Sequence, residues 1–195
     1  SLIASSKHYR DRISNTKINM IVLHHDAALS SYSCFKILEK RKLSIHFMID
    51  NDGKIFQSVP LCYSAQHAGN LNNNTIGIEI SNAVELKYNQ YYLIKKFGKR
   101  EEKKNLIVHG KKYNSLGFYE CQMNSLSKLL NVLCNYYEIN VDFPRDEKGN
   151  FIYGLHKNSI QKKFNGLICH YHIDRDKWDP IALDLQDLLN KIKEG

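Results

Sequence analysis

The chain alternates short apolar runs with longer stretches whose apolar residues recur every three or four positions. The short runs predict β-strands over residues 18–25, 44–49, 54–59, 75–81 and 167–170. Helical spacing predicts helices over residues 30–40 and 118–137, and a last helix that opens at Asp179-Pro180 and extends to Ile192. Strands and helices mixed in this way predict an α/β fold in which helices cover a mainly central sheet.

Three further segments lack this regularity. Residues 1–17 are polar and basic, and we expect an N-terminal arm or a short helix there. Residues 61–74 predict a loop that is rich in small and polar side chains. Residues 85–113 form the most irregular segment and carry many lysines, so we interpret them as an insertion with a basic face. A run of this kind is also typical of an ordinary solvated surface.

The composition is that of one globular domain spanning residues 1–195, with 43% hydrophobic and 25% charged residues. No apolar stretch approaches the roughly 20 residues needed to span a bilayer. The net charge of +8 favours polyanionic partners, such as nucleic acid, an anionic membrane or the phosphate-rich polymers of a bacterial wall. The first residues contain no recognisable signal peptide, which leaves export undecided. Five cysteines without CxxC spacing do not indicate a disulfide framework.

Two of the predicted strands end in histidine. The run Ile21-Val-Leu-His-His25 ends in two adjacent imidazoles on opposite faces of the strand, and Leu167-Ile-Cys-His170 ends in the same manner. A hydrolytic zinc site needs three protein ligands and one open position for water. His24, His170 and Asp179 are therefore candidate ligands of one metal ion.

These residues also have ordinary structural explanations. The histidines can be strand-end residues without a ligand role, and Asp179 can be a helix N-cap. His172 is a rival ligand, because alternation puts it on the same side as His170. Glu79 is a carboxylate inside an apolar strand, which is costly unless it is paired or faces a cleft, although it can also lie on a solvated face. Lys177 can be a surface residue.

Five motifs, in this order along the chain, resemble the zinc-dependent N-acetylmuramoyl-L-alanine amidases, the family of AmpD-like enzymes, many phage endolysins and the peptidoglycan recognition proteins. The motifs are Ile21-Val-Leu-His-His25, Ser44-Ile-His-Phe-Met-Ile-Asp50 with Asp52-Gly-Lys-Ile55, Gln66-His-Ala-Gly69, Thr75-Ile-Gly-Ile-Glu79, and His170 with Lys177-Trp-Asp-Pro180. The resemblance implies a mixed central β-sheet flanked by helices, with a zinc groove. Some phage members carry a tyrosine where this chain has Ile45, and residues 85–113 have no counterpart in the family pattern.

The resemblance also implies a reaction, which is zinc-dependent hydrolysis of the amide between N-acetylmuramic acid and L-alanine. The implied roles are metal ligands His24, His170 and Asp179, catalytic residues Glu79 and Lys177, and substrate-binding residues His67 and His25. Zn²⁺ would polarise the scissile carbonyl and activate water, Glu79 would transfer the proton, and Lys177 would donate to the oxyanion. The implied partners are peptidoglycan or muropeptides and not nucleic acid, for a secreted, periplasmic or phage-delivered protein.

Two alternatives belong to other classes of function. A non-catalytic peptidoglycan-binding module shares the fold, but modules of that kind typically lack zinc ligands. A metal-dependent nuclease fits the basic charge and the histidine and aspartate residues near residue 170, but it leaves the Gln66-His-Ala-Gly69 and Thr75-Ile-Gly-Ile-Glu79 matches unexplained. The sequence leaves open the oligomeric state, the stem-peptide preference and the biological role, which includes phage lysis, wall remodelling, muropeptide recycling and delivery to a competitor.

Overall fold

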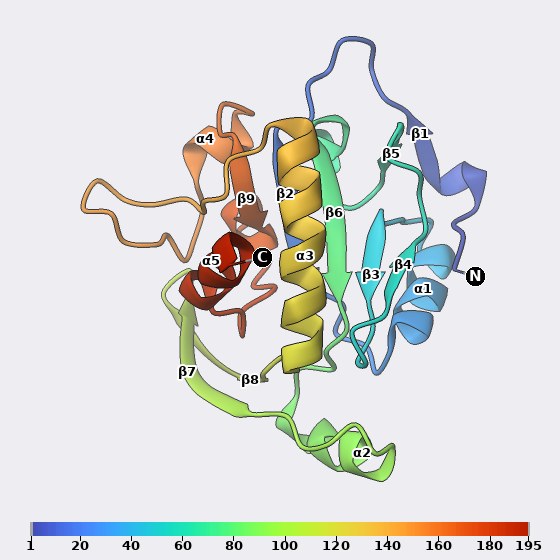
Figure 1. Ribbon diagram of the computed structural model, residues 1–195, viewed down its shortest axis with the longest axis vertical. Coiled ribbons are helices and arrows are strands. Elements are labelled where there is room, and N and C mark those ends of the chain that lie inside the picture. The colour runs from blue at the N-terminus through green and yellow to red at the C-terminus, as the bar shows by residue number, and fades with distance from the viewer. Residues whose placement is uncertain (1, 195) are drawn as a thin grey trace.

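The computed structural model describes residues 2–194, which fold around a five-stranded mixed sheet (Figure 1). In spatial order, the strands are β4 (Ile55–Gln57), β3 (Phe47–Ile49), β6 (Thr75–Ile80), β2 (Met20–His25) and β9 (Gly166–Cys169). Strands β3, β6, β2 and β9 run parallel, and β4 pairs antiparallel with β3. The predicted α/β fold with a mixed central sheet is thereby confirmed.

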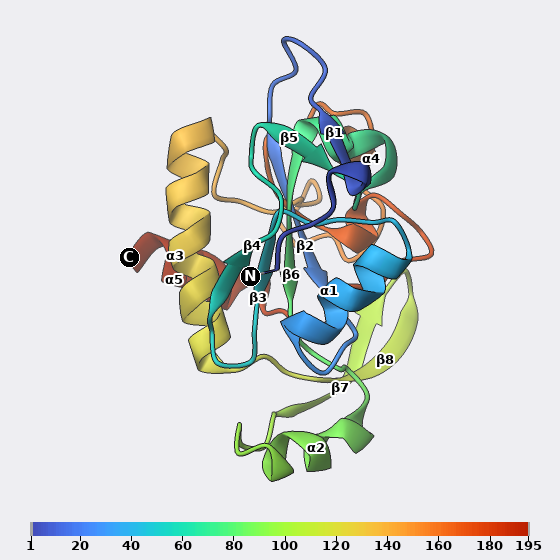
Figure 2. The same ribbon diagram turned by 90° about the vertical axis from the view of Figure 1, so that its right-hand side faces the viewer.

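Helices cover both faces of this sheet (Figures 1 and 2). Helices α3 (Glu120–Tyr137) and α5 (Leu185–Glu194) pack on one face, and α1 (Ser31–Lys40) lies on the other. The isoleucines of β6 point to the α3 side and are fully buried in the main core together with Leu126 and Leu130. Met20 and Val22 of β2 point to the opposite side. Both faces of β2 are therefore apolar until the strand ends in histidine, as is usual for a parallel sheet. On β6, the face opposite α3 carries Thr75, Gly77 and Glu79.

Smaller elements complete the fold. They are the strand pair β1 (Tyr9–Asp11) and β5 (Tyr63–Ala65), the hairpin β7 (Glu102–Val108) and β8 (Lys111–Leu116), the helices α2 (Asn89–Ile94) and α4 (Lys157–Ile160), and the 3₁₀ helices Ser6–His8, Gly69–Asn74, Leu86–Tyr88 and His170–His172. Among residues 2–194, no helix combines the length and the apolar composition that crossing a bilayer requires. All five cysteines are free thiols.

Three expectations from the sequence are wrong. Residues 61–74 are not a continuous loop, because they contain β5 and the 3₁₀ helix Gly69–Asn74. The last helix begins at Leu185 and not at the Asp179-Pro180 step. Asp184 is the residue that caps it, because its Oδ1 accepts a hydrogen bond from the Asp187 backbone N–H at 3.0 Å. Residues 85–113 are not irregular, since they contain α2, β7 and the start of β8. Most side chains of this hairpin are exposed, so its strands lack the apolar alternation by which strands are detected.

Candidate metal centre

Three predicted ligands meet at the carboxyl ends of two neighbouring strands. Parallel pairing sets Leu23 of β2 beside Cys169 of β9, so the next residue of each chain, His24 and His170, emerges at the same edge of the sheet. The loop between the 3₁₀ helix His170–His172 and α5 returns Asp179 to this edge. Crevices outside the carboxyl ends of parallel strands are the usual ligand sites of such sheets.

The ligand atoms of these residues form a nearly equilateral triangle. His24 Nδ1 lies 3.0 Å from His170 Nδ1 and 3.0 Å from Asp179 Oδ2, and His170 Nδ1 lies 3.1 Å from the same carboxylate oxygen. Ligand atoms of a tetrahedral zinc ion, with bonds of about 2.0–2.1 Å, are separated by about 3.3 Å. Two imidazoles and one carboxylate are also a donor set that zinc hydrolases use. The three residues therefore fit one zinc ion with a fourth position left for water.

The electrostatics of the cluster favour the protonation states that bind metal. Burial, followed by the neighbouring His170, lowers the pKa of His24 to about 4, so its imidazole is neutral. Burial by itself would raise the pKa of Asp179, but His170 and His24 outweigh it and hold this pKa well below its usual value. Metal ligands must be deprotonated to bind. A neutral imidazole beside an ionised carboxylate meets that requirement near neutral pH.

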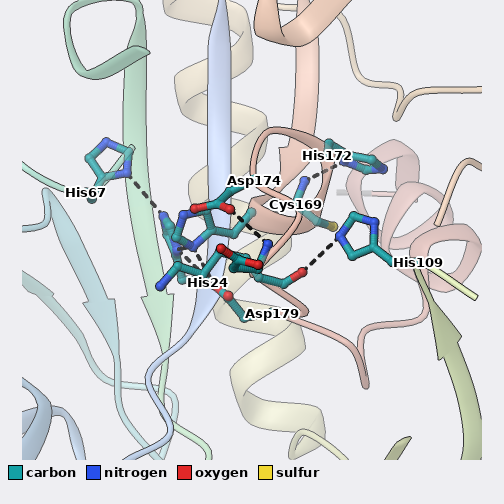
Figure 3. A network of polar contacts seen from close by, with 10 residues as sticks. His24, His67, His109, Cys169, His172, Asp174 and Asp179 are labelled. Atoms are coloured by element: carbon teal, nitrogen blue, oxygen red, sulfur yellow. Dashed lines mark hydrogen bonds and ion pairs between the residues drawn. The ribbon is translucent and has the colours of Figure 1, made fainter. Parts of the chain in front are cut away.

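A hydrogen-bond chain behind His24 fixes which of its nitrogens carries the proton. The Thr75 hydroxyl donates to the Leu71 carbonyl at 3.0 Å, so it accepts from His67 Nε2 at 3.2 Å. His67 Nδ1 is then an acceptor, and His24 Nε2 donates to it at 3.1 Å (Figure 3). The lone pair of His24 therefore lies on Nδ1, the atom that faces His170 and Asp179.

The His67 ring packs against β6 at a position where only glycine leaves room for it. A side chain at Gly77 of β6 would put its Cβ only 2.6 Å from the His67 ring. The backbone N–H groups of His67 and Ala68 both donate to Asn72 Oδ1, at 3.1 and 2.6 Å, and hold the loop against the sheet. His67 was predicted to touch substrate. It lines the cavity described below and also bonds to a candidate ligand.

Glu79 is on the strand next to His24 and faces the same side of the sheet. The register pairs Glu79 of β6 with His24 of β2. Its Oε2 atom is buried and has no hydrogen-bond partner among residues 2–194. Burial, together with the charges of Asp26 and Asp179, raises the pKa of Glu79 well above its usual value. A carboxyl group whose pKa is raised in this way in the wall of a cavity is a candidate for proton transfer.

A cavity of about 450 Å³ lies over these groups. Its wall contains His24, His170, Asp179, Glu79, Lys177, His25 and His67, together with Ile37, Leu38 and Arg41 of α1 and its C-terminus. All seven predicted site residues thus line one cavity, although they come from four separate parts of the chain. Arg41 and Trp178 also line it. Trp178 belongs to the Lys177-Trp-Asp-Pro180 motif but was assigned no role, and Arg41 was not detected because it belongs to no motif and to no polar pattern around a strand end.

The structure resolves two alternatives for the ligands. His172 is fully buried and uses both ring nitrogens within the fold: Nδ1 accepts from the Cys169 N–H at 2.8 Å, and Nε2 donates to the Ile152 carbonyl at 2.7 Å (Figure 3). It has no lone pair left for a metal. Asp179 is not the N-cap of α5, because Asp184 has that role.

Sequence comparison gives a family for this chain. Residues 14–182 match the Amidase_2 family, which is described as N-acetylmuramoyl-L-alanine amidase. No curated protein matches the chain by sequence.

Several solved structures share its fold. The N-acetylmuramoyl-L-alanine amidase LysC from Clostridium intestinale is 19% identical with a TM-score of 0.56, over 98% of this chain and 96% of that one. The E. coli amidase AmiD, in complex with anhydro-N-acetylmuramic acid-L-Ala-D-γ-Glu-L-Lys, is 20% identical with a TM-score of 0.57, over 97% of this chain and 65% of that one. The endolysin of Thermus scotoductus bacteriophage Ph2119 is 14% identical with a TM-score of 0.54, over 96% and 92% of the two chains.

Proposed function

Since this chain belongs to the N-acetylmuramoyl-L-alanine amidase family, we propose that it holds one Zn²⁺ with His24, His170 and Asp179 and hydrolyses the amide between N-acetylmuramic acid and L-alanine. The observation that carries the proposal is the triangle of ligand atoms, 3.0 to 3.1 Å apart, in the wall of a cavity. Bound zinc supplies Lewis acidity, which polarises the scissile carbonyl and lowers the pKa of water towards about 7.

We assign the proton transfers to Glu79. A general base must come within hydrogen-bond reach of the proton that it takes. Glu79 is level with His24 on the adjacent strand, and neighbouring strands lie about 4.8 Å apart. Its unpartnered Oε2 is free to accept a proton from the attacking water. The same carboxyl group then delivers this proton to the leaving amine of L-alanine.

We assign stabilisation of the developing oxyanion to Lys177. This residue lines the cavity two positions before Asp179, so the loop that supplies the third ligand also supplies the cation. An ammonium group fixed beside the scissile carbonyl stabilises negative charge on its oxygen in the transition state, an effect of roughly 3 kcal/mol. His25 and His67, in the wall of the same cavity, are assigned to substrate contact.

The lining of the cavity supports a substrate class for this site. Ile37 and Leu38 offer an apolar surface, and Arg41 and Lys177 offer positive charge to the carboxylates of a stem peptide. A muropeptide is the ligand in the AmiD complex. We therefore infer that peptidoglycan or its fragments are the substrate, and that the protein acts at the bacterial cell wall after secretion, in the periplasm or by phage delivery.

Digestion of purified sacculi tests the proposal. The zinc-loaded wild-type protein is expected to release peptides with a free L-alanine amine, identified by mass spectrometry. Glu79→Gln keeps the shape of the side chain but not its basicity, and should lower turnover by about 10²–10⁴-fold while zinc content stays the same. Glu147→Gln, an exposed position away from the cavity, is the matched control.

Three results contradict parts of the proposal. Turnover of Glu79→Gln at the wild-type rate would remove Glu79 as general base. Binding to sacculi without release of fragments would indicate the non-catalytic module. Nicking of plasmid DNA, with intact sacculi, would indicate a metal-dependent nuclease.

A further inference from the structure

The β7–β8 hairpin, most of which lies in the segment that we interpreted from the sequence as an insertion, contacts the loop that carries Lys177 and Asp179. Figure 3 shows one of these contacts, in which His109 reaches toward that loop from the end of the hairpin. Two side chains of the hairpin contact this loop. His109 bonds to the backbone of Lys177, and Tyr113 stacks on the side chain of Trp178. Lys177 and Trp178 directly precede Asp179.

His109 makes the contact to the backbone. It occupies the two-residue turn His109-Gly110 between β7 and β8, where both residues have positive φ, 52° and 74°, as a tight hairpin turn requires. Its Nε2 donates to the carbonyl of Lys177 at 3.1 Å. Its own backbone N–H donates to the Tyr153 carbonyl at 2.9 Å, which holds the turn in place. The Lys177 carbonyl is therefore bonded to a position that is itself fixed.

Tyr113 makes the contact to the side chain. Its ring stacks on Trp178 with a centroid distance of 5.1 Å and an angle of 4° between the planes. Trp178 also makes a T-shaped contact with His25, with a centroid distance of 4.7 Å and an angle of 71° between the planes. The indole thus contacts both β8 and the end of β2, the strand that carries His24. Aromatic pairs with these two geometries attract each other beyond the effect of burial.

The hairpin is well anchored to the rest of the fold. Val108, at the end of β7, is fully buried in the main core, and Leu116, at the end of β8, is fully buried against Tyr92. The loop is less constrained by its own backbone, since the Lys177 N–H bonds to the Asp174 carbonyl at 3.3 Å, a long hydrogen bond. The more rigid partner in this contact is the hairpin.

We propose that the β7–β8 hairpin is a clamp that sets the positions of Asp179 and Lys177, with His109 and Tyr113 as its positioning residues. This inference rests on the proposed function, because it gives the clamp the task of presenting a zinc ligand and a cation. Neither residue touches the three ligand atoms, and each acts through the residue that it holds. Groups that orient a metal ligand in this way typically change metal affinity or activity by about 10–100-fold when they are removed.

The test uses Trp178, which is the only tryptophan of the chain, as a built-in probe. Tyr113→Ala removes the stack, and Tyr113→Phe restores the ring without the hydroxyl. His109→Asn removes the donor to Lys177 while keeping a residue that tolerates positive φ. Lys112→Ala, an exposed neighbour on the same strand, is the matched control. For each full-length protein we would measure Trp178 emission without metal, the zinc dissociation constant by chelator competition, and kcat and KM on muropeptides.

Tyr113→Ala is expected to shift Trp178 emission to longer wavelength. Tyr113→Ala and His109→Asn should each weaken zinc binding by about tenfold and lower kcat with little change in KM. Tyr113→Phe and Lys112→Ala should behave as wild type. Unshifted emission in Tyr113→Ala would show that the stack is absent, and wild-type zinc binding and kcat in both clamp variants would show that it positions nothing; either result overturns the clamp. Failure of the proposed function looks different, because wild type would bind zinc and cleave no muropeptide while the variants still differed in zinc affinity.

Discussion

Two buried polar clusters lie at the carboxyl edge of the sheet, one around Arg100 and one formed by His24, His170 and Asp179. The side chain of Arg100 is 2% exposed and brings a full positive charge into the fold. Its guanidinium donates to Asn51 Oδ1 at 2.6 Å, Gln122 Oε1 at 3.1 Å, and the carbonyls of Gly117 and Ser81 at 2.8 and 3.0 Å. This cluster contains a cation together with four acceptors for its two terminal nitrogens, while the buried Nε has no partner among residues 2–194.

Aromatic rings complete the environment of this cation. The guanidinium carbon lies 4.4 Å from the ring centre of Tyr92 and 4.0 Å from that of Tyr119, and these two rings are nearly perpendicular to each other, so the charge contacts two aromatic rings. The four acceptors lie just after β3, just after β6, just after β8 and in the first turn of α3. Arg100 therefore ties residues 85–116 to the sheet, and it does so without any group from outside the chain.

The histidine cluster has the opposite composition. Its three converging atoms are two imidazole nitrogens and a carboxylate oxygen, and the Thr75–His67 chain keeps the lone pair of His24 directed at the other two. Electron pairs that point at one another are unfavourable unless a cation or a proton lies between them. We expect the cluster that contains its own cation to stabilise the fold, and the cluster that contains none to be the one that binds a metal ion, as proposed above.

The largest effect is expected when the negative charge of the histidine cluster is removed. Asp179→Asn keeps the size of the side chain and should lower kcat/KM by roughly 10³-fold, or about 4 kcal/mol in transition-state free energy, because zinc loses a ligand. The free energy of unfolding of the metal-free protein should change little. Zinc content, sacculus digestion and urea unfolding measure the three quantities. A variant that keeps zinc and turnover would exclude Asp179 as a ligand.

Substitution in the Arg100 cluster should have the opposite result, with a loss of stability in the metal-free protein. Arg100→Met fills a similar volume but leaves four acceptors without a donor, and it should lower the free energy of unfolding by about 3 kcal/mol. Arg100→Lys keeps the charge but cannot reach all four acceptors or contact both rings as the guanidinium does, so an intermediate loss is expected. Urea unfolding of the metal-free proteins measures both. Equal stability of wild type and Arg100→Met would show that the cation anchors nothing.

The same contrast explains what the sequence could and could not predict. His24 and His170 end apolar runs, and that local pattern shows both a buried strand and a polar residue at its end. Asp179 was ambiguous, because a carboxylate before a proline fits a helix cap as well as a ligand. The choice depended on Asp184, which caps α5 in its place. The ligand role of these residues stays a prediction.

Nothing in the sequence around Arg100 indicated that its side chain is buried. It stands among lysines in a segment that we interpreted as a basic surface, and its neighbours Lys95, Lys96 and Lys99 are indeed exposed. What distinguishes Arg100 is a set of acceptors that come from distant parts of the chain, such as Asn51 and Gln122. The β7–β8 hairpin escaped detection for a similar reason, since its few buried side chains pack against elements far away in sequence.

The smallest expected effect concerns the hydrogen-bond chain that keeps the histidine cluster open to a cation. His67→Phe preserves the ring but removes the acceptor for His24 Nε2, so His24 can carry its proton on Nδ1, where it competes with zinc. Zinc binding should weaken by about tenfold, or about 1.4 kcal/mol. Thr75→Val removes only the acceptor for His67 and should have a smaller effect in the same direction. If chelator competition gives both variants the wild-type dissociation constant, the direction of the lone pair is set by the metal itself and not by this chain of hydrogen bonds.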